Sequence, residues 1–271
     1  MRATKLALGL AGLLAAGLAA PAMAATTIWN FQTSNCTTNG SSDGNNHSCT
    51  PAGAPSVTAY AFANTVGAAN TQLEQGIIQL FSGNGLGVKN KDRPGGPGDG
   101  NDDTENSSSQ GEHAIDNEDR FDIVLLAFSE PVKLTHLEIG WKSNDSDMTV
   151  LAFTGGDGSS CSGLGIAGQT YSALTGCGWN FVHNLSNVPE DSLTSIGNAA
   201  TFSQYWLIGT YLGISCSGAT DCVTISADTK IDHVKLIAVK GDTGDKQVPE
   251  PGTLLLLAAG ALGLWWRRRV R

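Results

Sequence analysis

The segment Phe121–Phe128 restricts the fold more than any other part of the sequence. Apolar side chains occupy both faces of an extended strand here: Phe121, Ile123, Leu125 and Ala127 on one face, and Val124, Leu126 and Phe128 on the other. A strand that is apolar on both faces must be covered on both sides. We therefore expect this strand at the centre of a β structure.

The next apolar segment changes phase partway along. Val132 and Leu134 share one parity, whereas Leu137, Ile139 and Trp141 share the other. Successive side chains of a strand point to opposite faces, so an extra residue is needed to keep all five on one face. The pattern predicts a β-bulge or bend near His136.

Other short segments rich in Val, Ile, Leu and aromatic residues are bounded by Gly, Asn, Asp and Ser, which is typical of strands. Helical periodicity is weak, and the 34 glycines argue against long helices. We predict an all-β fold, an antiparallel β-sandwich of jelly-roll type. The expected strands are Thr26–Gln32, Gly76–Phe81, Phe121–Phe128, Val132–Trp141, Met148–Phe153, Gln204–Leu212, Cys222–Ser226 and Ile231–Val239.

The N-terminus has the features of a secretory signal peptide. Arg2 and Lys5 precede an apolar stretch from Leu6 to Ala20, and small residues stand at Ala22 and Ala24. We expect residues 1–24 to be removed by cleavage after Ala24. The alternative is an uncleaved anchor, but the apolar stretch is short.

The C-terminus carries a second apolar stretch. Residues 253–266 contain no charge, and the basic residues Arg267, Arg268, Arg269 and Arg271 follow. A helix of this length reaches about 21 Å, short of a hydrocarbon core of roughly 30 Å. Tryptophans favour the membrane interface and arginines hold the adjacent end in the cytoplasm. We expect a short transmembrane helix that serves as a temporary anchor.

Val248, Pro249, Glu250 and Pro251 lie immediately before this helix, and the two prolines favour an extended backbone. With the apolar helix and the basic cluster, residues 248–271 resemble the tails of PEP-CTERM proteins. These tails are recognised by exosortases in Gram-negative bacteria that make extracellular polysaccharide. The resemblance implies export through the inner membrane, transient anchoring, processing by an exosortase-type enzyme, and a final place at the cell surface or in the extracellular matrix.

Residues 25–247 remain for the folded domain, and they are acidic. Between the signal peptide and the apolar helix, residues 25–252 hold 25 acidic and 10 basic side chains, a net charge near −15. This balance argues against nucleic acid or anionic lipid as a partner. We therefore expect contact with the membrane only through the C-terminal tail.

A long loop at residues 89–119 is nearly free of apolar side chains and rich in Gly, Asp and Asn. Loops of this length in compact domains are either mobile or functional. Oxygen ligands suit calcium, the candidate cofactor. The candidate ligands are Asp99, Asn101, Asp103, Asp116 and Asp119. The EF-hand pattern fails, because Thr104 replaces its glycine and Gln110 its closing glutamate, so a solvated acidic loop is the alternative.

A further acidic group, Asn144, Asp145 and Asp147, falls between two expected strands. Asn and Asp favour turns, so turn formation alone explains this group.

Six cysteines in an exported chain predict disulfides. The sequence allows 15 connectivities; the spacing favours the local pairs Cys36–Cys49, Cys161–Cys177 and Cys216–Cys222. No Cys-x-x-Cys motif occurs, which argues against zinc.

Catalysis finds little support, since no nucleophile elbow, His-Glu-x-x-His or phosphate-binding loop occurs. His113 beside Glu112 and Asp116 is the only local cluster worth testing. Sugar stacking would need an exposed aromatic ring, and Trp179 in a glycine-rich stretch is the best candidate. Trp29, Trp141 and Trp206 lie within apolar strands, where core packing is the more natural role.

The middle of the chain also resembles the ectodomain of an exosortase-dependent surface-protein family of unknown role. The resemblance rests on Gly85–Val88, Glu112–Asn117, Phe121–Leu126, Gly140-Trp141 and Asp145–Asp147. We expect a non-enzymatic surface or matrix protein with a structural or interaction role in an exopolysaccharide or biofilm setting. The alternatives are a carbohydrate-binding module, with extracellular polysaccharide as the partner, and an enzyme acting on matrix polymers.

Overall fold

In the computed structural model, the two expected strands Phe121–Phe128 and Val132–Trp141 merge into a single long strand, β9 (Asp122–Asn144). The structure describes residues 25–66, 71–91, 113–118, 120–155, 161–210, 212 and 230–244. The remaining strands are β1 (Thr26–Asn30), β2 (Cys36–Asn39), β3 (Asn46–Cys49), β4 (Val57–Val66), β5 (Gln72–Gln75), β6 (Ile77–Phe81), β7 (Gly85–Lys89), β8 (Ile115–Asp116), β10 (Met148–Phe153), β11 (Trp179–Leu185), β12 (Thr194–Ser195), β13 (Ser203–Thr210) and β14 (Asp232–Thr243).

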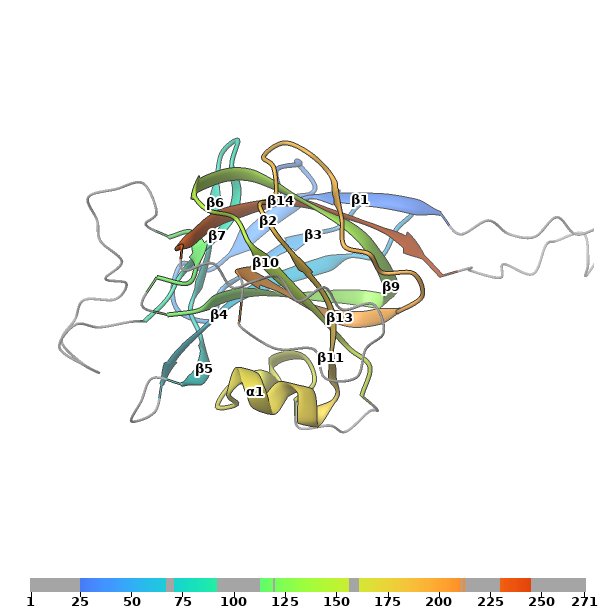
Figure 1. Cartoon of the computed structure of the whole chain (residues 1–271). Coiled ribbons are helices and arrows are strands. Elements are labelled where there is room, and N and C mark those ends of the chain that lie inside the picture. Colours follow the sequence, from blue (N-terminus) through green and yellow to red (C-terminus); the bar gives the residue numbers. More distant parts are fainter. Residues whose placement is uncertain are drawn as a thin grey trace, which may run out of the picture. The chain divides into compact units, whose positions relative to one another are not determined.

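These strands belong to one sheet with a main path β11-β10-β13-β9-β14-β7-β6, which curls into a barrel-like shape (Figure 1). All pairings between the named strands are antiparallel. The predicted antiparallel β class is therefore confirmed, while the jelly-roll type stays a prediction. One short helix, α1 (Tyr171–Leu174), and two 3-10 turns, η1 (Gly163–Ile166) and η2 (Thr175–Cys177), complete the described elements.

Strand β9 is buried on both faces, as its sequence predicts. Its first half pairs with β13 on one side and β4 on the other, and its second half pairs with β14. Val124 and Leu126 belong to the larger core, which the curled sheet encloses. Ile123 and Leu125 belong to a second core on the opposite face, together with residues of η1, α1 and β11.

The predicted bulge near His136 is confirmed. His136 lies opposite Lys240 and Leu134 lies opposite Gly241, so Thr135 is the extra residue. As a result Leu134 and Leu137 are both fully buried in the same core.

A second bulge at Gly140 was not predicted from the sequence. Ile139 lies opposite Leu236 and Trp141 lies opposite Lys235, which leaves Gly140 without a partner on β14. A Cβ atom at Gly140 would stand 2.6 Å from the carbonyl oxygen of Asn84, so only glycine lets the turn between β6 and β7 pass this close. Ile139 and Trp141 are two residues apart and would share one face of a regular strand. The bulge between them breaks this alternation.

Several strands were missed by the sequence prediction, and β4 is the most important of them. Ala59, Ala61 and Ala63 supply most of its inward positions, and all three are buried against β9. Alanine is depleted in strands, so its alternation gives only a weak strand signal. The narrow side chains nevertheless suit a position beside the bulky face of β9.

Both described ends of the domain lie on one pair of strands. Thr26 of β1 lies opposite Asp242 of β14, and the backbone N–H of Thr243 donates to the carbonyl of Ala25 at 2.9 Å. The predicted signal peptide, residues 1–24, and the predicted tail, residues 248–271, lie outside the described residues, as do the expected strand Cys222–Ser226 and most of the loop at residues 89–119.

Among the described helices, none has the length and apolar character needed to cross a membrane.

A candidate cation site at one end of the sheet

Three strand ends meet where the chain passes from β9 to β10. Asp145 follows the last residue of β9, Asp147 precedes the first residue of β10, and Asp232 is the first residue of β14. The backbone fixes this meeting: Asp145 accepts a hydrogen bond from the N–H of His233 at 3.3 Å, and Asp147 donates its N–H to the Asp232 carboxylate at 2.6 Å.

The three aspartates form a compact, buried group. Each offers a carboxylate oxygen, and these oxygens lie within 4.8 Å of one another. Asp145 is 2% exposed, Asp147 is 6% exposed and Asp232 is 3% exposed. We call Asp145, Asp147 and Asp232 the aspartate group.

Hydrogen bonds hold the carboxylates in place. The side-chain amide of Asn117 donates to Oδ2 of Asp232 at 2.7 Å, and the N–H of Asp232 donates to Oδ1 of Asn117 at 2.8 Å. The N–H of Asn187 donates to Oδ1 of Asp147 at 2.7 Å. The orientation of the group is thus set by the residue that follows β8, by the turn after β11 and by the start of β14.

The negative charge of the group is costly. At an effective dielectric constant of about 20, two carboxylate charges about 5 Å apart repel by about 3 kcal/mol. Lys230 lies 3.4 Å from Asp145, but its side chain is 58% exposed, so water screens this pair.

The pKa of Asp232 is raised by its buried, negatively charged surroundings. Burial raises this pKa to about 7, and the charges of Asp147 and Asp145 add to the rise, while the hydrogen bonds from Asp147 and Asn117 oppose it. A group of this kind is neutralised either by protons or by a bound cation. Three carboxylates with neighbouring amide oxygens are the ligands that calcium prefers.

Of the predicted calcium ligands, only Asp116 is among the described residues. Asp99, Asn101, Asp103 and Asp119 lie outside the described residues. Asp116 is fully buried on β8, where it lies opposite His233 of β14, and its charge acts on Lys235. Turn formation alone explains Asp145 and Asp147 in the sequence. Asp232 gave no signal at all, because it stands alone in the sequence and joins the others only through strand pairing.

Lys235 forms a second buried charged site on β14. Its side chain is 4% exposed, and its Nζ lies 3.8 Å from the ring centre of Trp141 and 4.6 Å from that of Phe81. Burial lowers the pKa of Lys235 to about 8, and the charge of Asp116 partly restores it. Both rings stabilise the ammonium by cation–π attraction.

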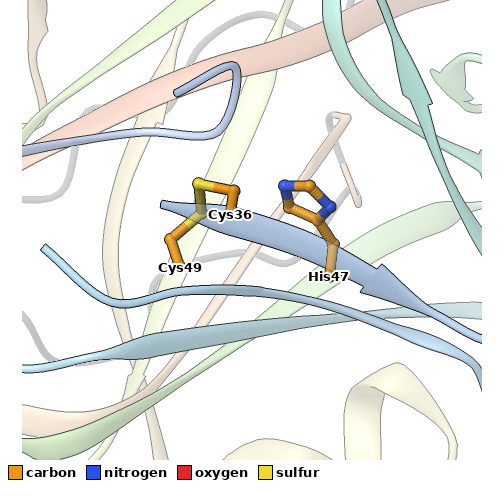
Figure 2. A group of neighbouring side chains, drawn as sticks. All are labelled: Cys36, His47 and Cys49. Carbon is orange, nitrogen blue, oxygen red and sulfur yellow. A yellow bond between two sulfur atoms is a disulfide. The ribbon is translucent and has the colours of Figure 1, made fainter. Parts of the chain in front are cut away.

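Two of the predicted disulfides, Cys36–Cys49 and Cys161–Cys177, are confirmed. Cys216 and Cys222 lie outside the described residues. Cys36 and Cys49 are directly opposite on β2 and β3, with His47 beside them (Figure 2). His47 bonds the carbonyl of Phe31 at 2.9 Å and the hydroxyl of Thr38 at 2.8 Å. Because both sulfurs are in the disulfide, this trio is a structural unit in the oxidised protein.

The prediction that Trp179 is exposed is wrong. Trp179 is fully buried, and its indole N–H donates to the carbonyl of Cys161 at 2.7 Å. The disulfide between Cys161 and Cys177 brings α1 and its flanking turns over the ring, which packs edge-on against Phe153 at 5.5 Å. Glycine-rich flanks do not indicate exposure here, because Ile166 of η1 and Leu174 of α1 pack in the same core as the ring.

The other tryptophans divide by position. Trp29 and Trp206 are buried core residues, as expected. Trp141 is only partly buried, because the bulge at Gly140 separates it from Leu137 and Ile139. His113 is described, but its predicted neighbour Glu112 is not, so the candidate acid–base cluster is not assembled from the described residues.

The family comparison matches the tail. Residues 247–269 match the model of the PEP-CTERM protein-sorting motif. This span includes the predicted sorting residues Val248, Pro249, Glu250 and Pro251 and the basic residues Arg267, Arg268 and Arg269. No curated protein and no solved structure matches the chain. The matched sorting motif supports the prediction of an exosortase-sorted, exported surface protein that is membrane-anchored in transit.

Proposed function

We propose that this PEP-CTERM protein has a structural, non-catalytic role in the extracellular polysaccharide matrix of a Gram-negative bacterium, after release from its transient anchor by an exosortase. The sorting motif at residues 247–269 carries the proposal. It begins three residues after Gly244, the last described residue of the domain. The domain is therefore the part of the protein that acts after the tail has been processed.

The construction of the domain supports a role outside the cell. Two disulfides close loops on β2–β3 and around η1 and α1. An antiparallel sheet with two separate cores surrounds the long strand β9. Cross-linked domains of this kind suit an oxidising compartment.

We propose further that a divalent cation such as calcium completes the fold at the aspartate group. The supporting observation is the geometry of the group. Three buried carboxylates whose oxygens lie within 4.8 Å of one another repel one another until a proton or a cation neutralises them. The cation would be held by Asp145, Asp147 and Asp232, with Asn117 orienting Asp232.

Carbohydrate binding is the second candidate function, and Trp141 is the residue that favours it. Trp141 is the partly exposed tryptophan of the described domain, and Lys235 supports its ring at 3.8 Å. A ring held in this way loses little entropy when a sugar stacks on it. Trp141→Phe should weaken binding to the host polysaccharide if this candidate is right. Phe202→Leu, at an exposed phenylalanine elsewhere, is the matched control.

Polysaccharide retention tests the matrix role. A deletion strain of the native host would be complemented with the wild-type gene, with Glu250→Ala in the sorting motif, or with Glu130→Ala on the domain surface. We expect the deletion strain to lose more polysaccharide on washing, and the wild type and Glu130→Ala to restore retention, whereas Glu250→Ala fails. Equal retention in the deletion strain and the wild type would contradict the proposal.

A further inference from the structure

The hairpin of β2 and β3 gathers three metal-ligating side chains. Cys36 lies directly opposite Cys49, and His47 precedes Cys49 by two residues, so both side chains lie on the same face of β3. The potential ligand atoms of the three residues lie within 4.8 Å of one another (Figure 2). We call Cys36, His47 and Cys49 the hairpin trio. Spacing along the chain hides this set, because Cys36 joins the other two only through the pairing of β2 with β3.

The imidazole of His47 already has the properties of a metal ligand. It is buried, and burial lowers its pKa, so the ring is neutral at pH 7. The hydroxyl of Thr38 lies 2.8 Å from Nδ1, and the carbonyl of Phe31 accepts from Nε2 at 2.9 Å. Whichever nitrogen binds an ion, the other keeps a polar partner. Metal-bound histidines almost always have such a partner, which fixes the ring orientation.

The two sulfur atoms differ in access. Cys49 is buried, whereas Cys36 is only partly buried. A small reductant can therefore approach the S–S bond from the side of Cys36. The hydroxyl of Thr33 lies 3.4 Å from Sγ of Cys36, where it can donate a hydrogen bond to a thiolate.

Contacts other than the disulfide hold the hairpin in place. Strand β3 pairs with β4 as well as with β2. The side chain of Asn45, directly before β3, accepts a hydrogen bond from the N–H of Ile78 at 2.7 Å and donates one to its carbonyl at 3.0 Å. Reduction of the disulfide should therefore free the sulfur atoms without separating them from His47.

We propose that the hairpin trio binds a zinc ion when its disulfide is reduced, with Cys36 and Cys49 as thiolates and His47 as a neutral imidazole. A dithiol supplies the two electrons and the two protons: the S–S bond breaks, both sulfur atoms become thiols, and the dithiol is oxidised to its own disulfide. The two thiol protons are released as the two Zn–S bonds form. Two thiolates balance the charge of Zn²⁺, so the buried site is neutral, and water completes the tetrahedral coordination.

The ion and the disulfide exclude each other, because both use the same two sulfur atoms. In oxidising surroundings the disulfide closes the site. Where a reductant is present, zinc replaces the disulfide as the cross-link between β2 and β3. This inference is independent of the matrix role and of the aspartate group.

Cobalt binding to the full-length protein tests the site, because Co²⁺ substitutes for zinc and its bonds to thiolates absorb in the near ultraviolet. The protein would be reduced with a dithiol, desalted without oxygen and titrated with Co²⁺. We expect a thiolate-to-cobalt band that Zn²⁺ abolishes. The oxidised protein should show no such band, even if Co²⁺ binds to the carboxylates of the aspartate group.

Two variants locate the site. Cys36→Ser, Cys49→Ser keeps the Cys161–Cys177 pair, which has no histidine grouped with it among the described residues, and should lose the band. His47→Gln keeps a donor for the carbonyl of Phe31. It should bind zinc at least about tenfold more weakly, since loss of an outer-shell partner alone costs about 10–100-fold in affinity. The melting temperature of each variant before reduction would confirm that the fold is retained.

Absence of the band in the reduced wild type, or an undiminished band in Cys36→Ser, Cys49→Ser, would overturn the proposal. X-ray absorption of the zinc-loaded wild type gives the ligands without any variant, so the role of His47 is tested even if His47→Gln does not fold. We expect sulfur and imidazole nitrogen together around the ion. Coordination by sulfur alone would overturn the assignment of His47.

Discussion

Asp147 donates its backbone N–H to the carboxylate of Asp232 at 2.6 Å, although 85 residues separate the two in the chain. This bond joins the start of β10 to the start of β14 and brings a third carboxylate, from Asp145, into the same buried space.

Calcium should stabilise the domain through the aspartate group. At about 100 times its Kd, a ligand that binds only the folded state adds about 2.7 kcal/mol. For a domain of this size that corresponds to a rise in Tm of roughly 5–10 °C. Calorimetry in excess EDTA and in excess calcium measures the rise, and identical Tm values in the two buffers would count against a calcium site.

Asp147→Asn should remove most of that calcium response. The amide can still accept the hydrogen bond from Asn187, so the local fold is preserved. In EDTA the variant should melt at or above the wild-type temperature, because one repulsive charge has been removed. Asp191→Asn is the control: Asp191 is exposed and has a positive φ of 50°, which asparagine tolerates. A full calcium response in Asp147→Asn would exclude the aspartate group as the site.

Lys235 should make the free energy of unfolding of the domain change with pH in the alkaline range. Its pKa is about 8 in the folded state and near 10.5 in the unfolded chain, so the unfolded chain holds the proton more tightly between these values. The wild type should therefore gain stability relative to Lys235→Met as pH rises from about 8 to 10. Chemical denaturation across this range measures the difference. Lys240→Met, at a half-buried lysine on the same strand, is the matched control.

Trp179→Ala should destabilise the fold rather than selectively remove a binding surface. Truncation of a buried tryptophan costs about 3–5 kcal/mol, and here the carbonyl of Cys161 also loses its donor. Trp179→Phe keeps most of the packing and should cost less. Denaturation curves of both variants test this. A fully stable Trp179→Ala would contradict the burial of the ring.

Loss of the disulfide between Cys36 and Cys49 should be tolerated at moderate cost. A sequence separation of 13 residues gives a loop-closure contribution of about 3 kcal/mol, or roughly 6–12 °C in Tm. The double variant Cys36→Ser, Cys49→Ser tests this by thermal melting. Removal of Cys161–Cys177, with a separation of 16, should cost a similar amount from loop closure. A double variant that melts with the wild type would show that pairing of β2 with β3 suffices.

The sequence was informative where one strand carries its own pattern. The double alternation of Phe121–Phe128 gave the central position of β9, and the phase change after Leu134 gave the bulge at Thr135. Short cysteine spacings gave two disulfides.

Features that depend on distant pairing were not accessible in this way. Alanine-rich β4 is a strand because β9 lies beside it. Asp232 is a candidate ligand because β14 pairs with the end of β9. Trp179 is buried because a disulfide folds α1 over it. In each case the neighbour, rather than the residue, determines the role.

The fate of the C-terminus tests the central claim most directly. The protein would be recovered from the inner-membrane and matrix fractions of the native host, and its intact mass would be measured in each. We predict that the matrix form lacks Arg271 and the apolar residues 253–266, with its new C-terminus at or near Pro249–Pro251, and that the full-length form is confined to the inner membrane. A matrix form that retains Arg271, or a protein found only in the inner membrane, would contradict the account.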